Sequence, residues 1–257
     1  RLFVKRNDIP KELYNLDILD GSPPCSSFSM AGNREKDWGK EKVFREGQAK
    51  QTLDDLFFDY ISLAKKLQPK VVIAENVKGL IQGNAKSYVR KIKAGFENAG
   101  YKVQLFLLNA ASMGVPQKRE RVFFICQRND LGFKGLKLGF DEEAITFSKI
   151  NENISTRDIS DLYYSLWNKK KDTDSDYGDI KLRTEGKISL FSTKFMSDNK
   201  VANTIVSGSD YVLHSHPRKP TQKEYQLIGS YPLDYNFKEM DAKYLIAYRG
   251  LDDDFDT

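Results

Sequence analysis

The chain has 257 residues, of which 40% are hydrophobic and 30% charged, and its formal net charge is +5. This composition is typical of a soluble globular protein with one large and one small domain, and the mildly basic charge is compatible with a polyanionic partner. No stretch has the apolar length of a membrane span. The two cysteines have neither the number nor the spacing that predicts a disulfide framework or a zinc site. We therefore expect a cytoplasmic protein.

The most informative segment follows a short predicted strand, Leu16–Asp20, and contains Pro23, Pro24 and Cys25. Proline holds its own φ near about −65° and disfavours helix in the preceding residue, so we expect the thiol on a stiff, extended segment. That geometry suits a nucleophile that attacks an electrophilic carbon from one direction. The alternative is a small buried side chain, since free cysteines are usually buried and inert.

The next segment, Met30–Lys50, is glycine-rich, basic and poor in apolar residues. Its cations include Arg34, Lys36 and Lys40. A segment of this composition is either a solvated connection or a mobile basic loop over a polyanion, and composition alone does not separate the two.

Beyond this segment, helical and strand periodicities alternate. The predicted elements are helices over Gln51–Leu67 and Ser87–Ala99 and strands over Val71–Val77, Tyr101–Asn109 and Val122–Cys126. Pro69 and Gly100 mark the ends of the two helices. This order predicts an α/β fold with a doubly wound, mainly parallel sheet, in which the last two strands are candidates for antiparallel pairing because a short loop joins them.

Charged residues lie at the ends of these strands. Glu75 stands near the C-terminal end of a buried strand, where α/β sheets place ligand groups. Arg119 and Arg121 alternate at the entrance of another strand, so we expect both to point the same way. The alternatives are a helix cap or solvated carboxylate for the glutamate and a solvated face for the arginines.

The pattern changes after about residue 140. Short mixed segments with scattered aromatic residues extend to about Lys200, and the polar run Asn168–Asp179 predicts a loop. We expect these aromatic side chains to form the core of a small domain rather than a stacking platform. The chain ends in the acidic stretch 252–257.

Three motifs, taken together, resemble a known family. Pro-Pro-Cys at 23–25, Glu-Asn-Val at 75–77 and Gln-x-Arg-x-Arg at 117–121 occur in the order and spacing of the DNA cytosine-5 methyltransferases, bacterial or phage type. The resemblance runs from about Asp17 to Asn236. It includes Thr204–Ile205, similar to a Thr-Leu pair in the family's target-recognition region, and Arg218–Tyr225, similar to the family's late helix.

The resemblance implies roles for single residues. Cys25 would add as thiolate to carbon 6 of cytosine, which makes carbon 5 nucleophilic. Glu75 would share a proton with ring N3 and accept from the exocyclic amine. Arg119 and Arg121 would bind the ring carbonyl, orient the glutamate and lower the thiol pKa. S-adenosylmethionine would be the methyl donor, with Pro24 beside it, and no metal is expected.

The implied partner is double-stranded DNA with the target cytosine flipped out of the helix. The DNA-binding residues implied by the resemblance are Ser29, Arg34, Lys36, Lys40, Gln117, Thr204 and Arg218. The implied function is methylation of cytosine carbon 5 in a specific duplex sequence, within a restriction-modification system and in association with the nucleoid.

The chain departs from the family in two places. It has no Phe-x-Gly-x-Gly turn before Asp17 and no Gly-Asn-Ser-Val-Pro-Pro segment after Ile246. The alternative functions are therefore a catalytically incomplete DNA-binding fragment or one subunit of a split enzyme with a complementary chain. A transfer RNA methyltransferase is less favoured, since the sequence has no Cys-Phe-Thr.

The same comparison of motifs predicts the domain organisation. The expected parts are an incomplete Rossmann-like methyltransferase domain over 1–140, a target-recognition domain over 141–205, a late helix and return to the catalytic domain over 206–240, and an atypical acidic tail over 241–257.

Overall fold

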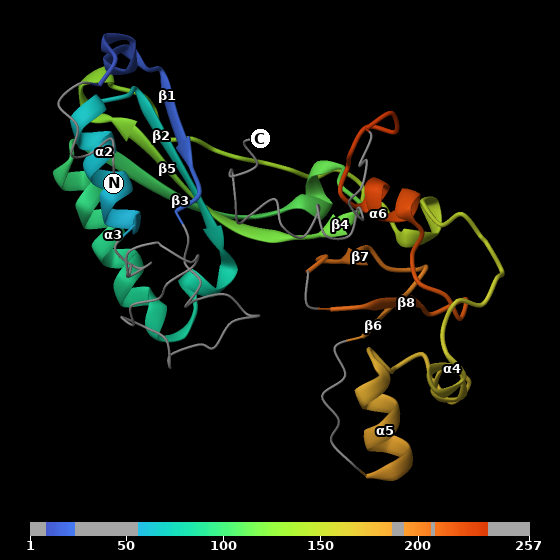
Figure 1. Ribbon diagram of the computed structural model, residues 1–257. Coiled ribbons are helices and arrows are strands. Elements are labelled where there is room, and N and C mark those ends of the chain that lie inside the picture. The colour runs from blue at the N-terminus through green and yellow to red at the C-terminus, as the bar shows by residue number, and fades with distance from the viewer. Residues whose placement is uncertain (1–8, 24–55, 187–192, 207–208, 236–257) are drawn as a thin grey trace, which may run out of the picture. The chain divides into compact units, whose positions relative to one another are not determined.

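The computed structural model describes residues 9–23, 56–186, 193–206 and 209–235, which Figure 1 shows as coloured ribbon. Contacts between Cα atoms divide the chain into two units: Arg1–Leu108 with Glu120–Gly139, and Asn109–Arg119 with Phe140–Thr257. The chain therefore enters the second unit twice, first through the short excursion 109–119. We predict that the first unit is the catalytic domain and the second the target-recognition domain, and this assignment stays a prediction.

Both units mix helices and strands. The strands are β1 (Ile18–Gly21), β2 (Val71–Val77), β3 (Tyr101–Asn109), β4 (Gln117–Lys118), β5 (Glu120–Arg128), β6 (Lys194–Met196), β7 (Ala202–Asn203) and β8 (Tyr211–Leu213). The α-helices are α2 (Leu56–Leu67), α3 (Lys86–Asn98), α4 (Asp161–Trp167), α5 (Tyr177–Glu185) and α6 (Gln222–Ile228). The 3₁₀ turns are Lys11–Asn15, Lys78–Ile81, Gly83–Ala85, Ala110–Met113, Asn129–Leu131 and Phe147–Lys149.

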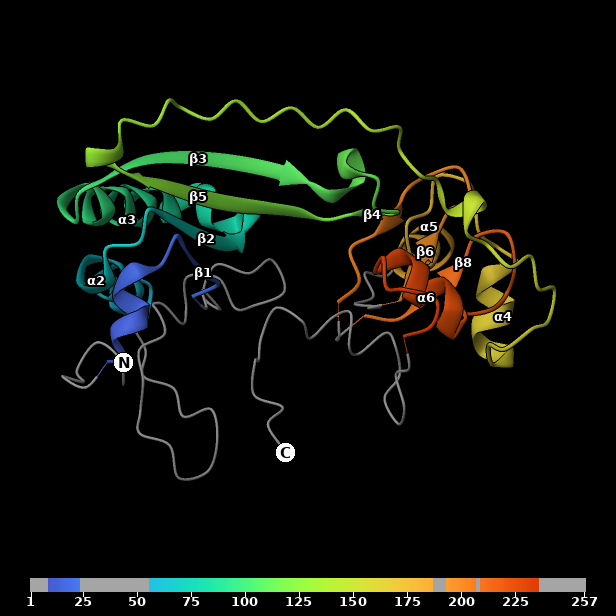
Figure 2. The same cartoon turned by 90° about the horizontal axis from the view of Figure 1, so that it is seen from above.

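The first unit contains a four-stranded sheet with the order β1-β2-β5-β3. β1 and β2 are parallel, whereas β2 and β5 are antiparallel. Figure 2 shows β3 and β5 side by side. The predicted α/β architecture is confirmed, and the sheet is mixed among the described strands. A strand that runs parallel to the preceding strand needs a long crossover connection, usually an α-helix. The connection from β3 to β5 is short and contains no α-helix, which agrees with the reversed direction of β5 in the sheet.

The core of the first unit lies between this sheet and the helices α2 and α3, which cover one face (Figure 1). Alternate side chains of β2, Val72 and Ala74, are buried against the helices. Phe57 of α2 packs edge-on against Phe96 of α3, with ring centroids 6.3 Å apart. Because side chains alternate along a strand, Glu75 projects from the face opposite to Ala74.

Cys126 is fully buried in the same core. Burial in apolar surroundings raises the pKa of its thiol well above the ordinary value. The thiol is therefore inert at neutral pH, and Cys126 does not compete with Cys25 as a nucleophile.

The described residues of the second unit form two hydrophobic clusters and two short parallel strand pairs, β4 with β7 and β6 with β8. Tyr177 and Phe195 are buried in one cluster, in agreement with the prediction that aromatic side chains here form a core. The predicted loop Asn168–Asp179 is wrong at its end, because α5 begins at Tyr177. The side chain of Asp176 accepts a hydrogen bond from the Asp179 amide and caps that helix.

Among the described helices of both units, none combines the length and apolar character needed to cross a lipid bilayer.

Candidate functional site

Glu75 lies near the C-terminal end of β2, on the sheet face that α2 and α3 do not cover. Its two carboxylate oxygens are held from two sides. Oε1 accepts from Arg121 Nε at 2.8 Å, and Oε2 accepts from the Ser22 hydroxyl at 2.5 Å. The Glu75 side chain is 27% exposed and the Arg121 side chain 21% exposed. The carboxylate is therefore oriented by protein donors and still reachable from solvent.

The pairing of β2 with β5 explains why Arg121 reaches this carboxylate. Arg121 stands opposite Val77, and Glu75 stands opposite Phe123, so the two charged side chains are diagonal neighbours on one face. Burial lowers the pKa of the Arg121 guanidinium, and the adjacent Glu75 opposes this shift. A guanidinium stays charged in proteins, so the contact is a charge-assisted hydrogen bond.

The segment after β1 is tied to the same end of β2. Besides the Ser22 contact, the buried Asn76 side chain donates from Nδ2 to the Pro23 carbonyl at 3.0 Å. The Asn76 Oδ1 accepts from the Val77 amide at 2.9 Å. The start of the Pro-Pro-Cys motif is thus bound to the Glu-Asn-Val motif, although the two are 53 residues apart.

The predicted residues Pro24, Cys25, Ser29, Arg34, Lys36 and Lys40 lie outside the described residues.

In the second unit, the β4–β7 pair brings two other predicted segments together. Lys118 pairs with Asn203, and the Thr204 hydroxyl donates to the Lys118 carbonyl at 2.5 Å. The structure therefore joins the Gln-x-Arg-x-Arg motif to the Thr-Ile pair, which is separated from it by 86 residues.

Two expectations about the Gln-x-Arg-x-Arg motif are corrected. Gln117 is 3% exposed, and its Nε2 donates to the Ile228 carbonyl at 3.2 Å, so its side chain lies inside the protein and not on a DNA-facing surface. Arg119 and Arg121 do not alternate on one strand, because Arg119 follows β4 and only Arg121 lies in β5. A boundary between the two units separates them, which strand periodicity does not reveal.

The expectation that Arg218 contacts DNA is also corrected. Arg218 is 2% exposed and forms a bidentate ion pair with Glu224, at 2.7 and 2.8 Å. Its remaining donors reach the Ile154 carbonyl, the Lys219 carbonyl and Asn151 Oδ1. All five guanidinium N–H groups are thereby satisfied, which leaves none for a phosphate. Burial and pairing make this arginine a structural residue.

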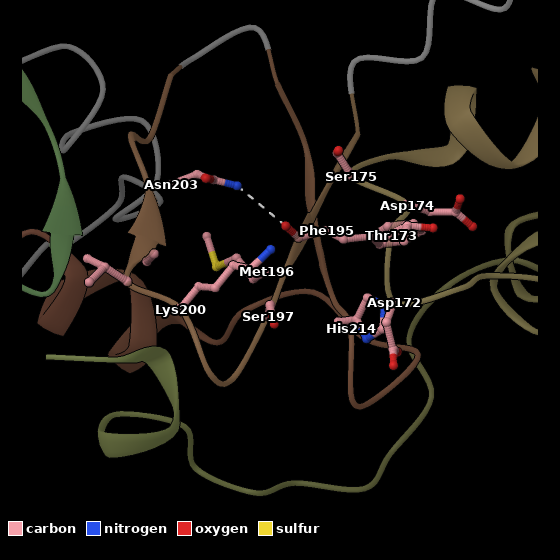
Figure 3. A pocket seen from close by; sticks show the side chains of 12 residues that line it. Asp172, Thr173, Asp174, Ser175, Phe195, Met196, Ser197, Lys200, Asn203 and His214 are labelled. Carbon is pink, nitrogen blue, oxygen red and sulfur yellow. Dashed lines mark hydrogen bonds between the residues drawn. The ribbon is translucent and has the colours of Figure 1, made fainter.

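A cavity of about 200 Å³ lies beside β7 in the second unit (Figure 3). Phe195 and Met196 line it together with polar side chains that include Asn203, Lys200 and His214. Asn203 Nδ2 donates to the Phe195 carbonyl at 3.4 Å, the dashed line in Figure 3. The sequence did not predict this cavity, because the residues that line it come from segments that are distant in the sequence. One local indication was present: Asn203, which lines the cavity, directly precedes Thr204, a residue predicted to bind DNA.

A metal centre is not formed by the described residues: within them, no three His, Cys, Asp or Glu side chains gather in a way that could hold an ion.

Comparison with known proteins places these motifs in context. A family model described as C-5 cytosine-specific DNA methylase matches residues 3–257. The type II methyltransferase M.FnuDI of Fusobacterium nucleatum is 32% identical over 229 residues, which cover 84% of this chain and 60% of that protein. The type II methyltransferase M.NgoPII of Neisseria gonorrhoeae is 28% identical over 276 aligned positions, which cover 98% of this chain and 70% of that protein. The chain thus spans about 60–70% of the length of these two relatives.

Solved structures agree on the fold. A protein described as a DNA modification methyltransferase from an E. coli prophage aligns with a TM-score of 0.58 and 18% identity, over 94% of this chain and 75% of that one. A Spodoptera frugiperda DNMT2 mutant aligns with a TM-score of 0.53 and 17% identity, over 92% of this chain and 75% of that one. At these identities the likeness supports the Rossmann-like methyltransferase fold.

Proposed function

Because the chain belongs to the C-5 cytosine-specific DNA methylase family, we propose that it transfers a methyl group to carbon 5 of a cytosine flipped out of duplex DNA. The observation that carries this proposal is the carboxylate of Glu75, oriented by Arg121 and Ser22 beside the segment that leads to Cys25. Consecutive Cα atoms are about 3.8 Å apart, and Cys25 is the second residue after the tethered Pro23, so chain connectivity limits how far the thiol can lie from the carboxylate.

The proposed chemistry begins with the thiolate of Cys25, which forms a bond to carbon 6 of the ring. The electron pair of the C5–C6 double bond then makes carbon 5 nucleophilic, and ring N3 takes up a proton that it shares with Glu75. Carbon 5 would take the methyl group from the donor, and the electron pair of the broken sulfur–carbon bond would stay on the donor's sulfur. A base removes the carbon 5 proton, the C6–S bond breaks with return of the thiolate, and N3 gives its proton back to Glu75. Arg121 keeps the Glu75 carboxylate in one orientation throughout.

The methyl donor implied by the family is S-adenosylmethionine, which supplies an electrophilic methyl group. Pro24, the one residue predicted beside the donor, lies outside the described residues, so the steps above depend only on the residues that act on cytosine.

The carbon 5 hydrogen gives a direct test. Addition of a thiolate to carbon 6 lets this hydrogen exchange with solvent, and that exchange needs no methyl donor. We therefore expect the protein to release tritium from duplexes that carry cytosine labelled at carbon 5, presented as a pool that contains every short sequence. Glu75→Gln should lower the release rate by about 10²–10⁴-fold, the usual loss when a general acid–base group is removed.

The matched control is Glu97→Gln. Glu97 is a surface carboxylate of α3 that pairs with Lys93 one helical turn away. Its replacement removes the same charge from the same unit and should leave the release rate unchanged. Release by the Glu75→Gln variant at the unaltered rate would contradict the proposed role of Glu75.

We also propose that the second unit supplies target recognition and that the protein is the modification enzyme of a restriction-modification system. Asn203 and Lys118 are exposed side by side on the β4–β7 pair, next to the cavity. An amide and an ammonium group are common donors to base edges and phosphates in DNA grooves. The names of the relatives as type II methyltransferases support this assignment, and no comparison points to a complementary chain.

The segment Met30–Lys50 is proposed to hold the DNA backbone. The triple variant with Arg34, Lys36 and Lys40 each changed to Ala should bind DNA more weakly, because each cation that neutralises a phosphate releases a counterion. The slope of log affinity against log salt should become shallower by about 0.9 for every phosphate that the variant no longer neutralises. Fluorescence anisotropy with a labelled duplex at several salt concentrations measures both quantities.

A second triple variant controls for net charge. Lys65, Lys91 and Lys134 are exposed on the first unit, outside the basic segment, and their change to Ala removes the same total charge. An equal decrease of affinity and slope in the two variants would mean that overall charge, and not the Met30–Lys50 segment, holds the DNA.

A further inference from the structure

Ser22 is the first residue after β1, and its side chain takes part in none of the proposed bond-forming or proton-transfer steps. Its hydroxyl donates to Glu75 Oε2 at 2.5 Å and lies 3.5 Å from the Glu75 carbonyl oxygen. Glycine, alanine or proline at this position would have no such donor. The contact joins the residue that begins the Pro-Pro-Cys segment to the carboxylate proposed to act on the ring.

The framework around Ser22 is held in place by two neighbours. The Tyr60 hydroxyl lies within hydrogen-bond distance of the Leu19 and Ile73 carbonyls, at 3.0 and 2.9 Å, and so links β1 to β2. A Cβ atom added at Gly21 would lie 2.6 Å from the Tyr60 ring. Close packing of the backbone at Gly21 against this ring fixes where β1 ends, and hence where Ser22 starts.

The number of acceptor sites on Glu75 shows what this arrangement can do. Each carboxylate oxygen offers two lone pairs. Arg121 occupies one on Oε1, and Ser22 occupies one on Oε2. Among the described residues, no further donor reaches the carboxylate, and one acceptor site remains on each oxygen. These two sites match the two adjacent N–H groups that cytosine presents once N3 is protonated, at N3 and at the exocyclic amine.

One donor alone would not hold the carboxylate plane. The terminal torsion of a glutamate side chain is broad, so a contact to a single oxygen leaves the other free to swing. Donors on both oxygens, from β5 and from the end of β1, remove this rotation. We propose that Ser22 is a positioning residue that, together with Arg121, aligns the two free acceptor sites of Glu75 with the ring; this inference rests on the proposed function.

The test compares Ser22→Ala with Ser22→Thr in the tritium-release assay. Ser22→Ala should lower the maximal rate about tenfold and leave DNA affinity within about twofold, because the carboxylate is no longer oriented and no DNA contact is removed. Ser22→Thr keeps the hydroxyl and should restore most of the rate. Ser62→Ala is the matched control, since Ser62 is an exposed serine of α2 whose hydroxyl donates to the Phe58 carbonyl.

The outcomes separate this inference from the proposed function. If the unaltered protein releases tritium and Ser22→Ala does so equally fast, the role of Ser22 is wrong and the proposed function stands. If the unaltered protein releases none, the proposed function is wrong, and a second measurement decides on Ser22: the ¹³C resonance of the Glu75 carboxyl carbon, assigned with Glu75→Gln. That resonance should move in Ser22→Ala and stay in Ser62→Ala; an unmoved resonance overturns the inference.

Discussion

Replacement of Cys25 by serine should abolish both tritium release and methyl transfer, with a loss of about 10⁴-fold or more in rate. A serine hydroxyl without a dedicated base is a far weaker nucleophile than a thiolate, so addition to carbon 6 stops. DNA affinity should stay within about twofold, because the substitution changes one atom and no charge-bearing contact to phosphate. Tritium release and anisotropy binding, measured on the same preparation, check the two halves of this prediction.

Cys126→Ala provides the internal control. Cys126 is buried in the core of the first unit and its thiol pKa is raised, so it has no part in the chemistry. The folded variant should react like the unaltered protein. With a methyl donor and duplex that contains 5-fluorocytosine, the adduct cannot lose its carbon 5 substituent and stays bound; a trapped peptide without Cys25 would show that the nucleophile is misassigned.

The second large effect concerns stability. Arg218→Ala should lower the free energy of unfolding by about 3–5 kcal/mol, because it leaves the fully buried carboxylate of Glu224 without its cation. The strength of the pair agrees with the direction of the arginine pKa, which the hydrogen bond to Glu224 raises. A loss of this size is a large part of the stability of a typical domain. Urea unfolding followed by circular dichroism measures it.

Two further variants identify the cause. Lys93→Ala breaks an exposed pair with Glu97 and should cost less than about 1 kcal/mol. Arg218→Met combined with Glu224→Leu removes both buried charges and should be more stable than Arg218→Ala alone, although the Thr221–Glu224 capping box is removed with them. If the double variant were less stable than Arg218→Ala, the unpaired charge of Glu224 would not be the reason for the stability lost in Arg218→Ala.

Local patterns predicted the first unit well. β2 and β3 begin at the predicted residues, because each apolar-rich run follows a strong helix-end signal, Pro69 before β2 and Gly100 before β3. α3 begins one residue before the predicted helix and ends one residue before its predicted end. The start of α5 was missed because Gly178 and Asp179 in its first turn resemble the polar run before it, and the capping contact of Asp176 becomes visible only in three dimensions.

The residues of the candidate site also divide into those that a local sequence pattern predicts and those that it does not. Glu75 could be predicted, since a carboxylate at the end of an apolar strand is a local feature. Ser22 could not, because its partner is 53 residues away and the contact exists only when β1 and β2 pair. Arg218 was wrongly expected on the DNA surface, since no local pattern distinguishes a buried, paired arginine from an exposed one.

The amino-acid sequence by itself determined the family, the α/β class and the types of group available for chemistry, because these depend on residue order and on short-range periodicity. Only the tertiary structure decided which of those groups meet: Ser22 and Arg121 on Glu75, Thr204 on Lys118, and Glu224 on Arg218. The physical reason is that burial and hydrogen bonding between distant segments follow from how strands pair and helices pack, and that pairing is a property of the whole chain.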